Sequence, residues 1–156
     1  MIVTEIDMEY REITSKDTKE IKQMAKIFMG AFNAPPWNDS WSEESAEERL
    51  TMMLDGRAAY GIAAYDNGKM TAGAVGCFER YCERIVFNLR EFFVDRSIKG
   101  KGIGTEFFKE TERRLKEKGV NEITLNTLKT AETESFYLKQ GMKNEEEMTV
   151  MVKKLI

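Results

Sequence analysis

The stretch Arg96–Phe108, RSIKGKGIGTEFF, holds three glycines within five positions and is flanked by segments rich in phenylalanine. Glycine loses more backbone freedom on folding than any other residue, so three close together in a regular element are unfavourable. The preceding segment, residues 85–94 (IVFNLREFFV), is rich in β-branched and aromatic residues and predicts a strand. Because this strand is apolar on both faces, we expect it in the interior of a sheet.

An amphipathic helix is predicted directly after the glycines. Core-type side chains recur every four residues, and two lysines precede Gly119 at the C-terminal end. The recurring positions are Ile103, Phe107, Thr111 and Leu115. The N–H groups at a helix start lack intrahelical acceptors, and the dipole there is positive, so this position attracts anions. Arg96, Lys99 and Lys101 add positive charge. The segment therefore predicts a site for a phosphate-type ligand.

Two common phosphate-binding loops do not match. A P-loop requires lysine and then Ser or Thr after its second glycine, whereas Gly104 is followed by Thr105 and Glu106. A dinucleotide-binding loop requires a third glycine where Thr105 stands and an acidic residue at the end of the following strand, but Glu122 begins that strand. A loop that serves only as a tight turn from strand to helix is a further alternative, but it accounts for one glycine rather than three.

The loop resembles the acyl-CoA pyrophosphate loop of the Gcn5-related N-acetyltransferase (GNAT) family, whose pattern is Gln/Arg-x-x-Gly-x-Gly/Ala. Both glycines are matched, by Gly102 and Gly104, while Lys99 replaces the usual Gln or Arg. Residues 136–142 (FYLKQGM) resemble the second family signature, a tyrosine four residues before a glycine and an apolar residue. The order of predicted elements also agrees along essentially the whole chain.

The resemblance implies a GNAT-like three-layer α/β fold, with a mixed, largely antiparallel central sheet flanked by helices. The alternation of predicted strands and helices supports this fold class. We expect a tight hairpin turn at Asp66-Asn67-Gly68 and a capping box from Ser40 to Glu43. Ser15 or Asp17 is expected to cap the first helix. The predicted strands are 9–13, 58–65, 70–78, 85–94, 121–127 and 148–155, and the predicted helices cover 21–32, 46–54, 105–118 and 130–140.

Composition limits the functional class. The 156 residues are 42% hydrophobic, enough for one domain with a sizeable core over residues 1–156. No run of about 18 apolar residues exists and the N-terminal segment carries acids, so we expect a cytoplasmic protein without membrane span or signal peptide. The net charge of −3 argues against nucleic-acid binding. The two cysteines match no zinc pattern and histidine is absent, so we expect neither a metal nor Ser-His or Cys-His catalysis.

The family resemblance further implies acetyl-CoA as the co-substrate. Its pyrophosphate would lie on residues 99–105, mostly through main-chain N–H groups, and its pantetheine arm would run beside residues 92–94. The family's asparagine at the start of the following helix is Thr130 here. The cofactor-binding residues that the resemblance implies are Phe92, Phe93, Val94, Lys99, Gly100, Lys101, Gly102, Ile103, Gly104, Thr105, Asn126 and Phe136.

The resemblance also implies that an amine attacks the thioester directly, without a covalent enzyme intermediate. Tyr137 would then be the general acid that protonates the leaving thiolate, although a tyrosine half-buried against the core would give the same pattern. Many family members place a glutamate where Asn88 stands, which can hold a water but cannot accept a proton for long. Glu91, three residues further along the strand, is expected on the opposite face. Glu79, Glu83 and a water chain are alternatives, so the base stays open.

The loop between the first two predicted helices suggests the acceptor. Trp37, Asp39 and Trp41 lie there, close to four glutamates, and tryptophan faces with carboxylates suit a cation such as a polyamine or an aminoglycoside. A solvated acidic helix with the tryptophans as loop anchors is the alternative. The loop loosely resembles that of aminoglycoside 6′-acetyltransferase-like family members. The glutamates are Glu43, Glu44, Glu47 and Glu48.

These observations predict an N-acetyltransferase that moves the acetyl group of acetyl-CoA to a primary amine of a small cationic molecule. Two alternatives stay open: a non-catalytic acyl-CoA-binding module, and an acetyltransferase for protein lysines or N-termini. A homodimer also stays open.

Overall fold

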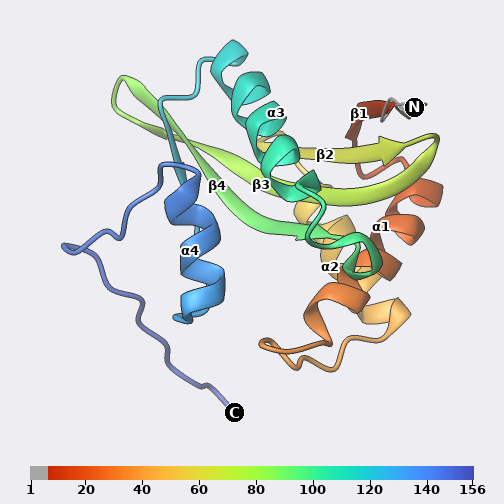
Figure 1. Cartoon of the computed structure of the whole chain (residues 1–156). Coiled ribbons are helices and arrows are strands. Elements are labelled where there is room, and N and C mark those ends of the chain that lie inside the picture. The colour runs from red at the N-terminus through yellow and green to blue at the C-terminus, as the bar shows by residue number, and fades with distance from the viewer. Residues whose placement is uncertain (1–6) are drawn as a thin grey trace. The chain divides into compact units, whose positions relative to one another are not determined.

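The computed structural model describes residues 7–156, in two compact units that divide after Asn126. Among these residues, the first unit holds a sheet with helices on both faces, and the second holds α4 (Ala131–Lys139) (Figure 1). The elements of the first unit are β1 (Met8–Ile13), α1 (Thr18–Phe32), α2 (Glu43–Leu54), β2 (Ala59–Asp66), β3 (Lys69–Tyr81), β4 (Arg84–Val94), the 3₁₀-helix η1 (Arg96–Ile98), α3 (Ile103–Glu117) and β5 (Glu122–Thr124).

The strands form one sheet in the order β1-β2-β3-β4-β5. Neighbours from β1 to β4 are antiparallel, whereas β4 and β5 are parallel, so the sheet is mixed and largely antiparallel as predicted. The predicted hairpin turn is also confirmed, because Asp66 pairs with Lys69 and the two residues between them have positive φ. These residues, Asn67 and Gly68, have φ of 48° and 81°, which a two-residue turn matched to the strand twist requires.

Two consecutive phenylalanines of β4 show how the layers are arranged. Phe92 stacks on Phe107 of α3 with ring centroids 5.2 Å apart, whereas Phe93 meets Phe28 of α1 edge-on at 5.4 Å. Because neighbouring strand residues point to opposite faces, α3 and α1 lie on opposite sides of the sheet, and α2 packs beside α1 (Figure 1). The predicted three-layer fold is confirmed.

A bulge interrupts β4 at Arg90. Val75 of β3 pairs with Glu91, but the next residue of β3 pairs with Leu89, so Arg90 is the extra residue. One extra residue shifts the alternation of side chains by one position, and Asn88 and Glu91 therefore lie on the same face of β4. The expectation that Glu91 faces away from Asn88 is wrong, because it assumed an unbroken alternation.

The start of α2 differs from its prediction by two residues. The hydroxyl of Ser42 accepts a hydrogen bond from the Ser45 N–H at 3.1 Å, and the Ser45 hydroxyl accepts one from the Ser42 N–H at 3.0 Å. A serine thus takes the place of the usual Glu or Gln, and the predicted box from Ser40 to Glu43 is wrong. At α1, Asp17 stands at the N-cap position, one of the two predicted alternatives, but its side chain makes no capping hydrogen bond and instead accepts one from the Thr14 N–H at 2.7 Å.

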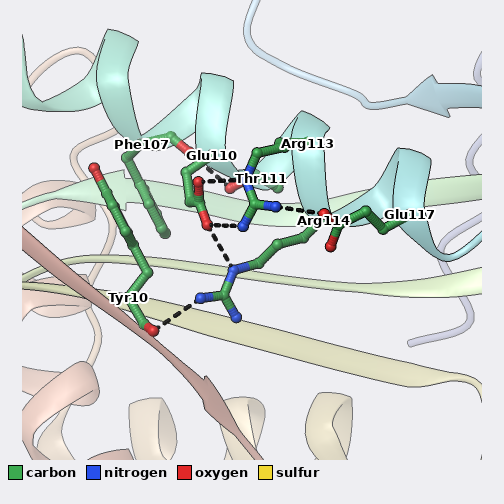
Figure 2. Close-up of polar contacts among 7 residues, drawn as sticks. All are labelled: Tyr10, Phe107, Glu110, Thr111, Arg113, Arg114 and Glu117. Carbon is green, nitrogen blue, oxygen red and sulfur yellow. Dashed lines mark hydrogen bonds and ion pairs between the residues drawn. The ribbon is translucent and has the colours of Figure 1, made fainter.

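A charge network connects α3 to the first strand (Figure 2). The carboxylate of Glu110 accepts hydrogen bonds from Arg113 at 2.6 and 2.9 Å and from Arg114 at 2.9 Å. Arg114 also donates to the main-chain oxygen of Tyr10 at 2.9 Å, and Arg113 donates to Glu117 at 2.5 Å. The hydrogen bond and charge of Arg113, with those of Arg114, lower the pKa of Glu110 to about 2. The network helps to fix the helix that follows the glycine loop.

The second unit confirms one predicted element and corrects another. Its helix, α4, begins after Thr130 and matches the predicted helix over 130–140. The strand predicted over 148–155 is wrong, because residues 143–156 form neither helix nor strand and their side chains are exposed. Alternating apolar residues do not form a strand by themselves, since the main-chain groups need a paired neighbour.

Candidate active site

The glycine loop leads from β4 into α3. The Asp95 carboxylate turns the chain by accepting a hydrogen bond from the Ser97 N–H at 2.9 Å. Gly100 and Gly102 then have φ of 92° and 79°, in the left-handed region that favours glycine, and Gly102 is the N-cap residue of α3. A Cβ atom at either glycine would meet no other atom within 4 Å. The main chain of the loop is therefore accessible to a close approach from outside.

The start of α3 has the properties of an anion site. The N–H groups in the first turn of an α-helix have no acceptor within the helix, and its first hydrogen bond joins the Glu106 N–H to the Gly102 oxygen at 3.1 Å. The buried side chain of Ile103 anchors this turn. The residues therefore fit a phosphate or pyrophosphate group. Three cations beside the turn are exposed: Arg96, Lys99 and Lys101.

A pocket of about 490 Å³ lies in the first unit, beside the bulge of β4. Its wall contains aromatic side chains from α1 and the following loop, charged side chains from α2 and β4, and the chain at and just after β5. The lining residues are Phe28, Phe32, Trp37, Asp39, Trp41, Arg49, Asn88, Leu89, Arg90, Glu91, Thr124, Leu125 and Asn126.

The pocket opens where β4 and β5 part. Their last pair joins Asn88 to Thr124, and the hydroxyl of Thr124 donates a hydrogen bond to the Asn88 side-chain oxygen. β5 ends there, before the predicted limit at residue 127. The bulge at Arg90 follows on β4, and a bulge bends its strand and increases the twist. Among the described residues, no further ladder pair joins β4 to β5, so this edge of β4 offers main-chain groups to an extended ligand.

Glu91 is the buried carboxylate of the pocket wall, with 8% of its surface exposed. Arg49 of α2 donates from Nε to Glu91 Oε1 at 2.7 Å, and its Nη2 lies 2.5 Å from the same oxygen. Burial raises the pKa of the Glu91 carboxyl above its ordinary value, and the charge and hydrogen bond of Arg49 oppose that shift. A carboxylate with a raised pKa is a stronger proton acceptor, as a general base requires.

The two tryptophans are held against α1. Trp41 meets Phe28 edge-on with ring centroids 5.0 Å apart, and its indole N–H donates to Asp39 Oδ2 at 3.0 Å. Trp37 meets Phe32 edge-on at 5.3 Å. Both tryptophans therefore anchor their loop and line the pocket at the same time. The predicted role in binding the acceptor and the alternative role as loop anchors are therefore compatible.

The pocket brings together six residues singled out from the sequence, which are Trp37, Asp39, Trp41, Asn88, Glu91 and Asn126. The four glutamates of α2 are not among the lining residues of the pocket. Their positions agree with the alternative prediction, a solvated acidic helix. Sequence reasoning missed Arg49 and Arg90. Arg49 stands three residues after Ala46 and one before Leu50, on the apolar stripe of α2. A cation at such a position in the helix pattern was the sequence signal that could have identified Arg49 as a pocket residue.

The implied cofactor residues of β4 use their side chains in packing. Phe93 is buried in the core against α1, and Phe92 contacts α3, so for Phe93 the main chain is what a ligand can reach. Tyr137 and Phe136 lie on α4 in the second unit, both half-buried, with ring centroids 5.1 Å apart. The roles of Tyr137 and Phe136 stay predictions.

Metal ligands, cysteines and apolar helices offer no second site among the described residues. No group of three or more His, Cys, Asp or Glu side chains among them is placed to hold a metal ion. Cys77 is half-buried on β3, and Cys82 is exposed. None of the helices within residues 7–156 has the length and apolar composition that a membrane crossing requires.

Comparison with known proteins identifies the class. The profile of the acetyltransferase (GNAT) family matches residues 21–142. The chain therefore belongs to the GNAT acetyltransferase family, in agreement with the glycine loop and the three-layer sheet. No curated protein sequence matches it.

Solved structures share the fold at low sequence identity. An aminoglycoside acetyltransferase, meta-AAC0020 from an uncultured soil metagenomic sample, in complex with sisomicin, has a TM-score of 0.72 and 19% identity, with 96% of each chain covered. A possible acetyltransferase from Clostridium difficile 630 has a TM-score of 0.77 and 15% identity, covering 97% of this chain and 99% of that one. Aminoglycoside N-acetyltransferase AAC(6')-Iy in complex with CoA has a TM-score of 0.70 and 16% identity over 100% of both chains. These likenesses establish the fold alone.

Proposed function

We propose that the chain is an acetyl-CoA-dependent N-acetyltransferase whose acceptor is a small molecule with a cationic primary amine. The observation that carries this proposal is the position of Glu91. Its buried carboxylate lies in the wall of a pocket that opens where β4 and β5 part. The same strand leads directly into the glycine loop, so one element connects an anion site to a proton acceptor.

The glycine loop is the proposed site for the pyrophosphate of acetyl-CoA. The open main chain at Gly100 and Gly102 and the start of α3 supply N–H donors, and the exposed cations beside them supply charge. The edge of β4 beyond its last ladder pair with β5 would run beside the amide groups of the pantetheine arm. When bound, acetyl-CoA supplies the acetyl group as an activated thioester.

The pocket is the proposed site for the amine. Asp39 and the tryptophan faces would hold the ammonium group, because carboxylates and aromatic faces both attract cations. Oε1 of Glu91 is bound to Arg49, so Oε2 would accept the proton that the ammonium must lose, directly or through a water held by Asn88. The amine nitrogen then bonds to the acetyl carbon as the carbon–sulfur bond breaks, the nitrogen releases its second proton to water as the amide forms, and the thiolate takes up a proton. Tyr137 is the proposed donor of that proton, on the family signature that it shares with Phe136 and Gly141.

A non-catalytic acyl-CoA-binding module is the second candidate, and the Arg49–Glu91 ion pair favours it. Position 88 carries no carboxylate, and the carboxylate nearby is already bound to a guanidinium group. The decisive experiment measures release of free CoA thiol from acetyl-CoA with a panel of amines that includes small molecules and peptides. Amine-dependent release supports the enzyme, release with peptides alone supports a protein acetyltransferase, and tight CoA binding without release from any amine supports the module.

A further inference from the structure

The charges of the pocket wall are balanced rather than acidic. Four of its lining side chains are charged, Asp39, Glu91, Arg49 and Arg90, and their formal charges cancel. All four line one pocket, where burial raises the pKa of Glu91, the charges of Arg49 and Arg90 oppose that shift, and the charge of Asp39 adds to it. A molecule with several positive charges would therefore meet two guanidinium groups as well as two carboxylates. The wall suits an acceptor that carries charges of both signs.

Arg49 is held in position before any ligand binds. Two of its nitrogens contact Glu91 Oε1, at 2.7 and 2.5 Å, and its guanidinium carbon lies 5.6 Å from the ring centroid of Trp41. Its third nitrogen, Nη1, has no hydrogen-bond partner among residues 7–156, and 35% of the side chain is exposed. A guanidinium group that is already oriented loses little further entropy when it binds, and its planar donors match a carboxylate.

Arg90 supplies a second cation to the same wall. It is the extra residue of the β4 bulge, and its side chain is exposed and lines the pocket. Within the described part of the chain its guanidinium group makes no hydrogen bond or ion pair. The bulge adds Glu91 to the same wall, because in a regular strand position 91 would lie on the face opposite to position 88. The pocket thus contains one oriented guanidinium and one unpaired guanidinium.

We propose that the acceptor carries a carboxylate on the same small molecule as its reactive amine, and that Arg49 and Arg90 bind this carboxylate. Asp39 and the two tryptophans then face the ammonium end. The acceptor class is therefore that of amino acids and related zwitterions rather than polyamines. The proposal rests on the proposed function for the identity of the reaction, and it specifies the substrate of the same site.

Tryptophan fluorescence tests the proposal without any need for turnover. The chain has two tryptophans, Trp37 and Trp41, and both line the pocket, so their emission reports its occupancy. The full chain with CoA is titrated with free α-amino acids, with the matching α-carboxamides, and with spermidine and sisomicin. The amino acids are expected to bind at least about tenfold more tightly than their carboxamides, as for a charge-assisted hydrogen bond. Equal or tighter binding of the carboxamides or the polycations would overturn the proposal.

Substitutions of the two arginines test whether they cause the preference for amino acids over carboxamides. Arg90→Gln should reduce the preference for the carboxylate severalfold, and it should fold normally because the side chain is exposed and unpaired. Arg57→Gln is the matched control, since Arg57 is exposed and is not among the lining residues. Arg49→Lys, which keeps the charge but loses the planar donors, should also weaken binding of the amino acids. A preference unchanged in Arg90→Gln and Arg49→Lys would overturn the assignment.

Thiol release on the same panel separates this inference from the proposed function. Selective binding of amino acids without any turnover would support the inference and reject the enzyme. Turnover of carboxamides and polycations at rates equal to those of amino acids would support the enzyme and reject the inference. Binding of no amine at all would reject both.

Discussion

The carboxylate of Glu91 and the side-chain amide of Asn88 line the same pocket although their positions on β4 differ by three, an odd number. The bulge at Arg90 produces this relationship, because Arg90 is an extra residue in β4 that has no partner on β3. A proton acceptor and a group able to hold a water are thereby brought to one face of the strand. Under the proposed mechanism the pair would share the task that the family resemblance assigns to a glutamate in line with position 88.

Glu91→Gln should lower kcat/KM by about 10²–10⁴-fold if Glu91 accepts the proton of the amine. The variant keeps the shape and a hydrogen-bond acceptor for Arg49, so the fold should survive. Burial raises the pKa of Glu91, and the ionised form is the active one, so wild-type activity should fall as the pH decreases through a value above the ordinary 4.5. Steady-state kinetics from pH 5 to pH 9 check both effects.

Glu83→Gln is the control for Glu91→Gln. Glu83 is exposed in the turn between β3 and β4 and is not a lining residue, although the sequence made it a candidate base. Its replacement should leave the rate and the pH profile unchanged. A Glu91→Gln variant with a full rate would leave water as the proton acceptor.

Gly102→Glu should weaken CoA binding at least about tenfold, whereas Lys101→Ala should weaken it only a few fold. In the proposed site several main-chain donors would share the phosphate contact, so one side chain would contribute little, while a carboxylate at position 102 would repel the anion at the start of α3. Isothermal titration with CoA measures both. Gly119→Glu is a matched control, because Gly119 also has positive φ, 80°, and open surroundings, at the other end of the helix. Equal affinities for Gly102→Glu and Gly119→Glu would reject the site.

Features that depend on residues close together in the sequence were predictable, whereas features that depend on residues far apart were not. The hairpin at Asn67-Gly68 and the glycine loop were predicted because φ preferences and turn chemistry are local. The bulge at Arg90 was not, because it exists only in the pairing of β4 with β3. Arg49 was missed because its partner, Glu91, is 42 residues away in sequence. The strand over 148–155 was predicted from alternation alone, and that pattern does not supply a neighbouring strand.

Glu110→Gln should lower the stability of the fold at neutral pH and have little effect in strong acid. Arg113 and Arg114 lower the pKa of Glu110 to about 2, so the ionised carboxylate stabilises the folded chain above the ordinary pKa of 4.5. That contribution is lost as the pH falls from 4.5 towards 2. Urea unfolding of wild type and variant at pH 7 and near pH 2.5 should therefore give a large difference in unfolding free energy at pH 7 and a small one in acid.

The control for Glu110→Gln is Glu106→Gln on the same helix. Glu106 pairs with Lys109 at 3.4 Å, and both side chains are 65% exposed, so the pair should contribute little to stability at any pH. If Glu110→Gln is no more destabilising than Glu106→Gln at pH 7, the network in Figure 2 does not stabilise α3.

Tyr137→Phe should lower kcat by about 10²–10⁴-fold if the phenol protonates the departing thiolate. Affinity for acetyl-CoA should change little, since the half-buried ring remains, and an interaction made only in the transition state lowers kcat and kcat/KM together. If the hydroxyl only completes a structural hydrogen bond, the variant should keep its rate and lose about 1 kcal/mol of stability. Measuring kcat and Tm separates the two cases, with Tyr81→Phe as the control because Tyr81 is exposed and bonded to Glu79. A full rate with a lowered Tm would remove Tyr137 from the mechanism and leave water as the proton donor.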